Sequence, residues 1–314
     1  MNILLTGYTG FLGSALNLAL DESTVLLGRV SVPNRKHYFS SFAPGENYFE
    51  ALKGVDCIVH CAARAHVMAD LAPDPLFEFR KVNTIGTLDL ACQAAEAGVK
   101  RFIFISSINV SGKSTMAGEP FNSNDTFIPE SPFGLSKYEA EEGLKRIAKK
   151  TGMEVVIIRS PLVYGPGVKA NFLSLLKIAN TALPLPFGAV RNRRSMIYID
   201  NLVDFIVRCI DHPKAGNQTF LVSDGQDLSL RQLIVLLRKA MGRSVRLLPV
   251  PEFVFRMAGA VIGKRELVES LIGSLQVDMS HAKNLLDWKA PFTVEQGIQV
   301  TVEDFLVNNK KDGM

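Results

Sequence analysis

The chain has 314 residues, 47% of them hydrophobic, which is enough to bury a large core and to form two lobes. Its formal net charge is +4 and its Lys and Arg residues are scattered, so nucleic acid is not the favoured partner, although a negatively charged nucleotide substrate would suit this balance. The four cysteines and five histidines show no metal-ligand spacing, which argues against a metal site. The apolar start lacks a basic n-region and no apolar stretch is long enough to cross a bilayer, so we expect a cytoplasmic protein without a transmembrane segment.

The first twenty residues predict a buried strand, a glycine turn and the start of a helix. The apolar run Ile3–Leu5 is followed by Gly7, Gly10 and Gly13, a spacing that lets the backbone turn tightly and approach a pyrophosphate. Apolar residues then recur at helical spacing, so the phosphate would lie at a helix N-terminus. We predict dinucleotide binding, with a purely structural turn as the alternative. The candidate cofactor-binding residues of this turn are Gly7, Thr9, Gly10, Phe11, Leu12 and Gly13.

The next apolar run, Val25–Leu27, ends at Gly28 and Arg29. An NAD site usually places an acidic residue at this position, where it accepts a hydrogen bond from the ribose 2′-hydroxyl, whereas an arginine can pair with a 2′-phosphate. Arg29 is therefore a candidate cofactor-binding residue that favours NADP, or the use of both NADP and NAD. The alternative is an ordinary solvated arginine in a polar loop.

Apolar strands continue to alternate with amphipathic helices up to about residue 165, which is typical of a doubly wound parallel α/β sheet, the Rossmann fold. We predict further strands at Cys57–His60, Phe102–Ser106 and Val155–Arg159, and helices at about 11–20, 76–97 and 134–150. Beyond residue 165 the pattern loosens into a smaller and mostly helical C-terminal lobe. We assign residues 1–165 and about 196–222 to the dinucleotide-binding lobe, and about 166–195 and 223–314 to the substrate lobe.

Six motifs follow one another along nearly the whole chain. They are the glycine turn, Cys61-Ala62-Ala63, Val82-Asn83-x-x-Gly86-Thr87, Ser106-Ser107, the helix that holds Lys137, and Tyr164-Gly165-Pro166-Gly167. In order and spacing they resemble the extended short-chain dehydrogenase/reductase family, in its nucleotide-sugar epimerase, dehydratase and reductase branch. The resemblance implies an NAD- or NADP-dependent enzyme, and it adds Ala62, Ala63 and Lys137 to the candidate cofactor-binding residues.

The resemblance also implies a catalytic set of a serine or threonine, a tyrosine, and a lysine four residues after the tyrosine. Ser107 and Lys137 match two of these positions, but the tyrosine position is Phe133, which has no ionisable proton. The phenol is the group that exchanges the proton at the sugar oxygen, helped by the neighbouring lysine cation. Three readings stay open: a substitution engineered to trap substrate, a natural variant that relays the proton through Ser107 or water, or a protein that only binds.

The likeness extends to the substrate, which it implies to be a UDP-sugar. Asn171 resembles the residue that contacts the diphosphate, and Arg194 resembles the arginine that clamps it, a role that suits a guanidinium fork. His66, Ser107 and Asn109 are the candidates on the sugar side, with a structural role for His66 as the alternative. The motifs look most like enzymes that act at C4 of UDP-N-acetylhexosamines in polysaccharide assembly, as 4-epimerases or 4-keto reductases.

Two further expectations concern partners. Related enzymes pair through the helices near 77–97 and 134–150, so we expect a homodimer. A catalytically dead protein that binds the dinucleotide and the UDP-sugar remains the alternative to an enzyme.

Overall fold

The computed structural model describes residues 1–311 apart from 66–72, 117 and 126. Its main body is a seven-stranded sheet in the order β3-β2-β1-β4-β5-β6-β9, and every neighbouring pair is parallel. This arrangement confirms the predicted doubly wound parallel sheet. The strands of this sheet are β1 (Ile3–Thr6), β2 (Val25–Gly28), β3 (His37–Phe39), β4 (Cys57–His60), β5 (Arg101–Ser107), β6 (Glu154–Ser160) and β9 (Thr219–Leu221).

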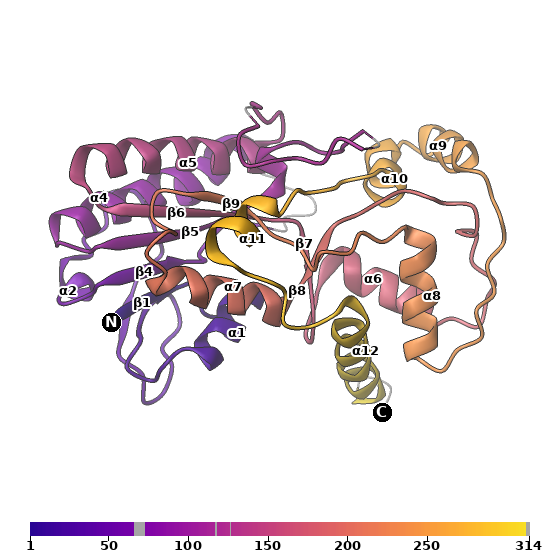
Figure 1. The fold of residues 1–314 in the computed structure, drawn as a ribbon, viewed down its shortest axis with the longest axis horizontal. Coiled ribbons are helices and arrows are strands. Elements are labelled where there is room, and N and C mark those ends of the chain that lie inside the picture. Colours follow the sequence, from indigo (N-terminus) through magenta and orange to yellow (C-terminus); the bar gives the residue numbers. More distant parts are fainter. Residues whose placement is uncertain (66–72, 117, 126, 312–314) are drawn as a thin grey trace.

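Helices cover both faces of this sheet (Figure 1). One face carries α1 (Phe11–Ala19) and α7 (Ile199–Asp211), and the other carries α4 (Thr87–Glu96) and α5 (Pro132–Thr151). Successive strand residues alternate between two hydrophobic clusters, so Leu5 packs with the α1–α7 layer and Leu4 with the α4–α5 layer. Both faces are buried, which is why the central strands are continuous apolar runs.

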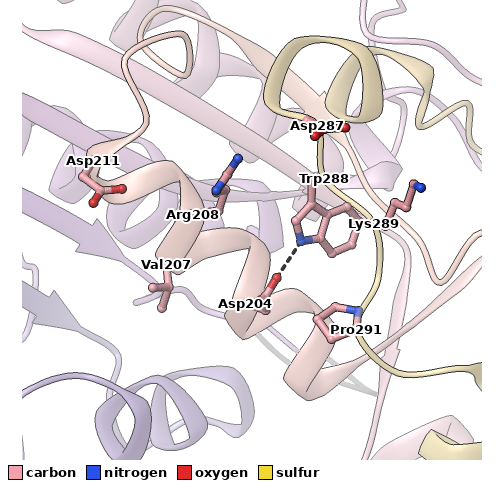
Figure 2. Close-up of a pocket in the computed structure, with 8 residues that line it drawn as sticks. All are labelled: Asp204, Val207, Arg208, Asp211, Asp287, Trp288, Lys289 and Pro291. Carbon is pink, nitrogen blue, oxygen red and sulfur yellow. Dashed lines mark hydrogen bonds between the residues drawn. The ribbon is translucent and has the colours of Figure 1, made fainter.

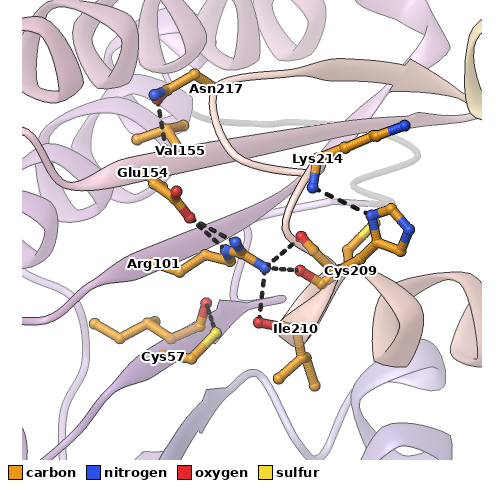
Figure 3. A network of polar contacts seen from close by, with 10 residues as sticks. Cys57, Arg101, Glu154, Val155, Cys209, Ile210, Lys214 and Asn217 are labelled. Atoms are coloured by element: carbon orange, nitrogen blue, oxygen red, sulfur yellow. Dashed lines mark hydrogen bonds and ion pairs between the residues drawn. The ribbon is translucent and has the colours of Figure 1, made fainter. Parts of the chain in front are cut away.

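Arg101 ties the α7 layer to the sheet. Its Nη1 donates hydrogen bonds to the carbonyls of Cys209, Ile210 and His212 at 2.8, 2.9 and 3.1 Å (Figure 3). The same guanidinium pairs with Glu154 of β6 at 2.6 Å. A cation at the carboxyl end of a helix satisfies the unpaired carbonyls and interacts favourably with the helix dipole.

The region predicted as one helix over 76–97 contains three segments. They are α3 (Pro75–Arg80), a π-helical turn (Lys81–Gly86) and α4. Within the π-helical turn, the Asn83 side chain donates to the Arg64 carbonyl at 3.1 Å and to Ser136 Oγ at 3.0 Å. The widened turn therefore places a polar side chain between the segment after β4 and the start of α5.

Most of the C-terminal part forms a second, predominantly helical lobe, as predicted, which lies to the right in Figure 1, whereas the segment that holds Ala282, Leu286 and Trp288 packs in the core of the main sheet. The core of the second lobe includes Tyr164 and Tyr198, which lie on the short paired strands β7 (Leu162–Tyr164) and β8 (Met196–Tyr198). The exact residues that divide the two lobes stay a prediction. The remaining helices are α2 (Phe49–Leu52), α6 (Ala170–Ala179), α8 (Leu230–Ala240), α9 (Glu252–Val261), α10 (Arg265–Ile272), α11 (Ser280–Leu286) and α12 (Val294–Lys311), with a 3₁₀ turn at Ile108–Val110.

Candidate active site

The glycine turn joins β1 to α1 at the carboxyl end of the sheet. Gly7 has φ +67°, and a Cβ there would lie 2.5 Å from the amide nitrogen of Ala62. A Cβ on Gly13 would lie 2.0 Å from the Gly7 carbonyl oxygen, so neither position admits a side chain. Gly10 is exposed, and among the described residues a Cβ there would closely approach just the Gly7 oxygen, at 3.2 Å. Gly7 and Gly13 shape the turn, and Gly10 leaves its outer side open.

The start of α1 has the properties of an anion site. Gly10 is the N-cap residue and supplies no side-chain hydrogen bond, and the first turn of α1 has no acidic residue. The first backbone N–H groups of this helix therefore lack a capping side chain, and the helix dipole adds partial positive charge. Thr9 is exposed, and Phe11 and Leu12 are half-buried beside these amides. The turn fits the pyrophosphate of a dinucleotide.

A buried chain of hydrogen bonds fixes the end of β4 against this turn. Thr6 Oγ1 accepts from the Ala62 amide at 3.0 Å and contacts His60 Nδ1 at 2.9 Å. His60 Nε2 contacts Thr87 Oγ1 at 3.0 Å, so both ring nitrogens are used. Burial lowers the pKa of His60 to about 3, so the ring is neutral and serves as a structural link rather than an acid or base. This link holds Ala62 and Ala63 beside the glycine turn.

Arg29 is exposed directly after β2, and its side chain makes no hydrogen bond or ion pair within the described residues. Next to it, a Cβ on Gly28 would lie 2.9 Å from the Tyr8 ring, and the Tyr8 hydroxyl donates to the Val30 carbonyl. The Tyr8 side chain therefore packs over the end of β2 and leaves Arg29 outside. A guanidinium at this place can pair with the 2′-phosphate of a ribose. The assignment of Arg29 to cofactor binding stays a prediction.

Lys137 is buried behind the carboxyl end of β5. Its Nζ donates to the Ile105 carbonyl at 2.9 Å and lies 4.4 Å from the centre of the Phe104 ring. Burial lowers the pKa of Lys137 to about 8, against the weaker opposing influence of Cys61 and Glu141. One of the three N–H groups of the ammonium is engaged by the carbonyl, so others remain for a ribose or a reacting hydroxyl.

Ser107 ends β5 and is half-buried, and its Oγ accepts from the Asn109 amide at 3.2 Å. A Cβ on Gly134 would lie 2.9 Å from the Asn109 carbonyl oxygen, so the first turn of α5 packs directly against the segment that carries Ser107 and Asn109. Lys137 follows Gly134 on the same helix. The structure thus brings three of the predicted site residues to one end of β5.

Phe133 lies in the first turn of α5, one helical turn before Lys137, where Ser131 is the N-cap residue and accepts from the Gly134 amide at 3.1 Å. Its ring is half-buried and meets Phe79 edge to face, with ring centres 5.9 Å apart. The Arg64 guanidinium lies 5.5 Å from the centre of the same Phe79 ring. An aromatic ring therefore occupies the place of the expected phenol.

The other phenols near the site do not replace it. Tyr138 is five residues further along α5, and this spacing places it on another face of the helix. Tyr164 is fully buried and donates to Asp224 Oδ2 at 2.7 Å. Burial and the neighbouring Asp224 carboxylate raise the pKa of Tyr164, so this hydroxyl is a structural donor.

Sequence reasoning missed a buried ion pair behind the site. Glu141 is fully buried on α5, pairs with Arg159 Nη2 at 2.7 Å and accepts from Ser106 Oγ at 2.5 Å. Arg159 also donates to Ser111 Oγ at 3.2 Å. The signal in the sequence is Arg159 itself, because a cation directly after the apolar run Val155–Ile158 has to find a buried partner.

The substrate-lobe candidates lie on separate elements. Asn171 is exposed in the first turn of α6. Arg194 is half-buried before β8, and its Nη1 donates to the carbonyls of Ser270 and Gly273 at 2.7 and 3.1 Å. Burial lowers the pKa of Arg194, although a guanidinium stays charged at neutral pH. His66 lies outside the described residues, and the roles of Asn171 and Arg194 stay predictions.

Two other observations concern metal binding and a surface pocket away from the site. Among the described residues, no cluster of three or more His, Cys, Asp or Glu side chains is arranged to hold a metal ion. A surface pocket lies between α7 and residues 287–291, where Trp288 Nε1 donates to Asp204 Oδ1 at 2.7 Å (Figure 2). None of its lining residues belongs to the glycine turn or to the β5–α5 region.

Comparison with known proteins agrees with this geometry. A model of the NAD dependent epimerase/dehydratase family matches residues 3–223. A UDP-glucose 4-epimerase of Vibrio cholerae is 48% identical over 318 residues, which cover 99% of this chain and 97% of that protein. The N-acetyl-alpha-D-glucosaminyl-diphospho-ditrans,octacis-undecaprenol 4-epimerase of Escherichia coli O157:H7 is 27% identical over 337 residues, which cover 99% and 97%. The crystal structure of UDP-glucose 4-epimerase from Thermotoga maritima with UDP-glucose matches with a TM-score of 0.78 at 25% identity, covering 98% of this chain and 100% of that one.

Proposed function

The chain belongs to the NAD-dependent epimerase/dehydratase family, and from this premise we propose that it binds a UDP-linked hexose or N-acetylhexosamine and acts at C4 as a 4-epimerase. The observation that carries the proposal is the meeting of Ser107, Lys137 and the glycine turn at the carboxyl end of one parallel sheet. In open α/β sheets, ligands bind at this edge. The similarity to UDP-glucose 4-epimerases over the whole chain supports C4 as the reacting carbon.

In this proposal, each residue of the site has a binding or positioning role. The first amides of α1 bind the pyrophosphate of the dinucleotide, and Lys137 holds its nicotinamide ribose. When bound, the nicotinamide supplies hydride exchange at C4 of the sugar. Ser107 Oγ hydrogen-bonds the 4-oxygen, and Asn109 binds beside it. On the far side, Arg194 and Asn171 hold the diphosphate, so that C4 is presented to the nicotinamide.

Phe133 limits the proton part of this reaction. Proton exchange at the 4-oxygen has to pass through Ser107 or a water molecule, because Phe133 carries no hydroxyl and Tyr164 is committed to Asp224. A serine hydroxyl is a far weaker acid than a phenol, so slow turnover with intact binding follows. A protein that only binds both ligands is the limiting case of this behaviour.

One observation favours a second function, that of a 4-keto reductase. Arg29 is exposed and unpaired among the described residues at the end of β2, where it suits the 2′-phosphate of NADPH, the usual reductant of such enzymes. An epimerase regenerates its cofactor in every cycle, whereas a reductase consumes one NADPH for each product. The two functions therefore differ in net cofactor use.

The test is product analysis with a panel of UDP-sugars and their 4-keto derivatives, using the chain as it is and the Phe133→Tyr variant. Interconversion of two C4 epimers without net change in cofactor absorbance supports the 4-epimerase. Stoichiometric oxidation of NADPH with a 4-keto sugar supports the reductase. If neither variant turns over but both bind UDP-sugar and quench the fluorescence of bound NADH or NADPH, the binding-only function stands. We expect a homodimer in the same preparations, which light scattering at micromolar concentration will check.

A further inference from the structure

Glu141 and Arg159 form a buried ion pair directly behind the residues that we assign to the sugar. The Glu141 side chain lies on α5 and is fully buried, and the Arg159 side chain lies on β6 and is 4% exposed. Arg159 Nη2 donates to Glu141 Oε2 at 2.7 Å, and Nε lies 3.1 and 3.2 Å from the two carboxylate oxygens. A planar guanidinium that meets a carboxylate in this way fixes the geometry of the pair as well as its charge.

The ion pair holds both ends of a short segment of the chain. At the start of the segment, Ser106 Oγ donates to Glu141 Oε1 at 2.5 Å. At its end, Ser111 Oγ accepts from Arg159 Nη1 at 3.2 Å. Ser107, the proposed partner of the sugar 4-oxygen, lies between these two anchors at the beginning of the 3₁₀ turn. The neighbouring hydroxyls of Ser106 and Ser107 therefore have different partners, and that of Ser106 is committed to the ion pair.

The same ion pair joins this segment to the helix that carries Lys137. Glu141 follows Lys137 by four residues, so the two side chains lie on one side of α5. Ser106 and Arg159 are register partners in β5 and β6, and α5 packs on both of these strands (Figure 1). The contacts of Glu141 and Arg159 thus connect α5, β5 and β6 at the place where Ser107 has to be set against Lys137.

Stability alone does not explain a buried ion pair at this place. Removal of two charges from water costs free energy, and hydrophobic residues of similar volume often stabilise a fold as well as the pair does. By contrast, a buried polar cluster in which every group is bonded favours one arrangement of the elements that it joins. Each side-chain nitrogen and oxygen of Glu141 and Arg159 has a partner within the described residues.

We propose that the Glu141–Arg159 pair is a positioning element of the active site, which holds the segment of Ser107 against α5 and keeps a negative charge beside the Lys137 ammonium. Glu141 and Arg159 are buried and act through Ser107 and Lys137 rather than on the substrate itself. The inference rests on the proposed function, because it takes Ser107 and Lys137 as the residues that meet the sugar and the cofactor.

Among the described residues, Glu141 supplies the negative charge near Lys137. Burial lowers the pKa of Lys137 to about 8, and Cys61 and Glu141 act in the opposite direction. Burial raises the pKa of the Cys61 thiol to about 12 and lowers the pKa of His60 to about 3, so both groups are uncharged at neutral pH. Loss of the Glu141 charge would remove this anion and leave the Arg159 cation unbalanced, and both changes disfavour the charged form of Lys137.

The first experiment replaces the ion pair by hydrophobic residues of similar volume, Glu141→Leu/Arg159→Met, in the Phe133→Tyr background. If the pair only stabilised the fold, this variant would be folded and as active as its background. We expect a folded protein whose kcat is at least roughly tenfold lower, because Ser107 is no longer held in place at the 4-oxygen. KM for the UDP-sugar should change by less than about twofold, since the predicted diphosphate subsite lies in the other lobe. Arg159→Lys keeps the charge but not the fork, so its kcat should fall between those of the background and the double variant.

The second experiment needs no turnover. It follows the titration of Lys137 by NMR in protein labelled with ¹³C at lysine Cε, and the Lys137 signal is identified by its absence from Lys137→Met. Glu141→Gln should move the midpoint of this titration down by roughly one pH unit. In Glu141→Leu/Arg159→Met the midpoint should move in the same direction by less, because the Arg159 cation is removed as well.

The matched control is Glu154→Gln, the same substitution in the Arg101–Glu154 pair, which joins the opposite ends of the same two strands (Figure 3). It should change neither kcat nor the titration of Lys137, and melting temperatures will show that each variant is folded.

The inference is overturned if the double variant keeps the kcat of its background, or if the Lys137 titration is the same with and without Glu141. It is also overturned if Glu154→Gln loses as much kcat as the double variant, because the effect would then come from strand pairing in general. If the Phe133→Tyr background turns over no UDP-sugar, the proposed function fails, and the NMR titration still decides whether Glu141 acts on Lys137.

Discussion

Restoring a hydroxyl at position 133 is the most direct test of the chemistry. Phe133 lies in the first turn of α5, next to the Asn109 segment and one turn before Lys137, so Phe133→Tyr adds a phenol with little change of shape. Positioned acid–base catalysis is worth roughly 10²–10⁴-fold, which corresponds to a barrier lowered by about 3–5 kcal/mol. We expect kcat to rise by this factor, whereas the dissociation constants of cofactor and UDP-sugar should change little.

The pH dependence separates a working phenol from an indirect effect. The phenolate is the base form, so the rate of sugar oxidation by Phe133→Tyr should rise with pH as the phenol ionises. The Lys137 cation stabilises the phenolate, but burial lowers the pKa of Lys137 to about 8, so this help is lost above about pH 8. The parent chain should lack the rising limb, because it has no group at position 133 that titrates.

The assay is the initial rate against pH under saturating cofactor for both proteins. Tyr138→Phe in the Phe133→Tyr background is the matched control, since it removes the other phenol of α5 and should leave the recovered activity intact. The reasoning is wrong if the parent chain already turns over rapidly and Phe133→Tyr gains nothing. In that case another group carries the proton, and Phe133 is a natural part of the mechanism.

The other predictions concern the two ligands and the buried lysine. Arg29→Asp should weaken NADP(H) binding more than NAD(H) binding by about 1.5–3 kcal/mol, the value of a charge-assisted hydrogen bond, and equal losses would remove Arg29 from the site. Arg194→Ala should raise the UDP-sugar dissociation constant at least roughly tenfold and Arg194→Lys by less, with cofactor affinity unchanged in titration calorimetry. Lys137→Met should abolish turnover yet raise the free energy of unfolding at pH 7 by about 1–3 kcal/mol, because burial of the cation depresses its pKa. The buried cation costs the parent chain most stability below about pH 8, and this cost falls as Lys137 loses its proton in the folded state. The stability that Lys137→Met gains in urea unfolding should therefore shrink as the pH rises from about 8 towards 10.5. A gain that is the same at every pH would contradict the prediction.

The main sheet was predictable because its strands are buried on both faces. The predicted strands Ile3–Leu5, Val25–Leu27 and Cys57–His60 agree with β1, β2 and β4 to within one residue. The edge strand β3 at His37–Phe39 was missed. This strand is short and pairs with another strand, β2, on one side, and the Phe39 side chain is 73% exposed. Its sequence is therefore not a continuous apolar run like those of the central strands.

The site was predictable where its parts lie close together along the chain. The four-residue spacing of Phe133 and Lys137 on one helix, and the place of Ser107 after a strand, need no knowledge of long-range register. The polar links across the sheet were not predictable. His60 meets Thr87, and Glu141 meets Arg159, only because the strands and helices pack in one particular register. Sequence alone shows that such buried polar groups need partners, but not which ones.

The face of α5 that carries these groups argues that the chain still binds a dinucleotide. Phe133, Lys137 and Glu141 follow at a spacing of four and so lie on one side of the helix. The Phe133 ring meets Phe79 of α3, whereas Lys137 and Glu141 meet β5 and β6. Glu141 is neutralised by Arg159, whereas Lys137 is held among the described residues by one carbonyl and an aromatic face, and its burial lowers its pKa and so disfavours its charge. A fold that needed no ligand would be more stable with an apolar residue there. We propose that a bound ribose accepts from the N–H groups of Lys137 that have no partner within the described residues, and this proposal holds whether or not the chain turns over its sugar.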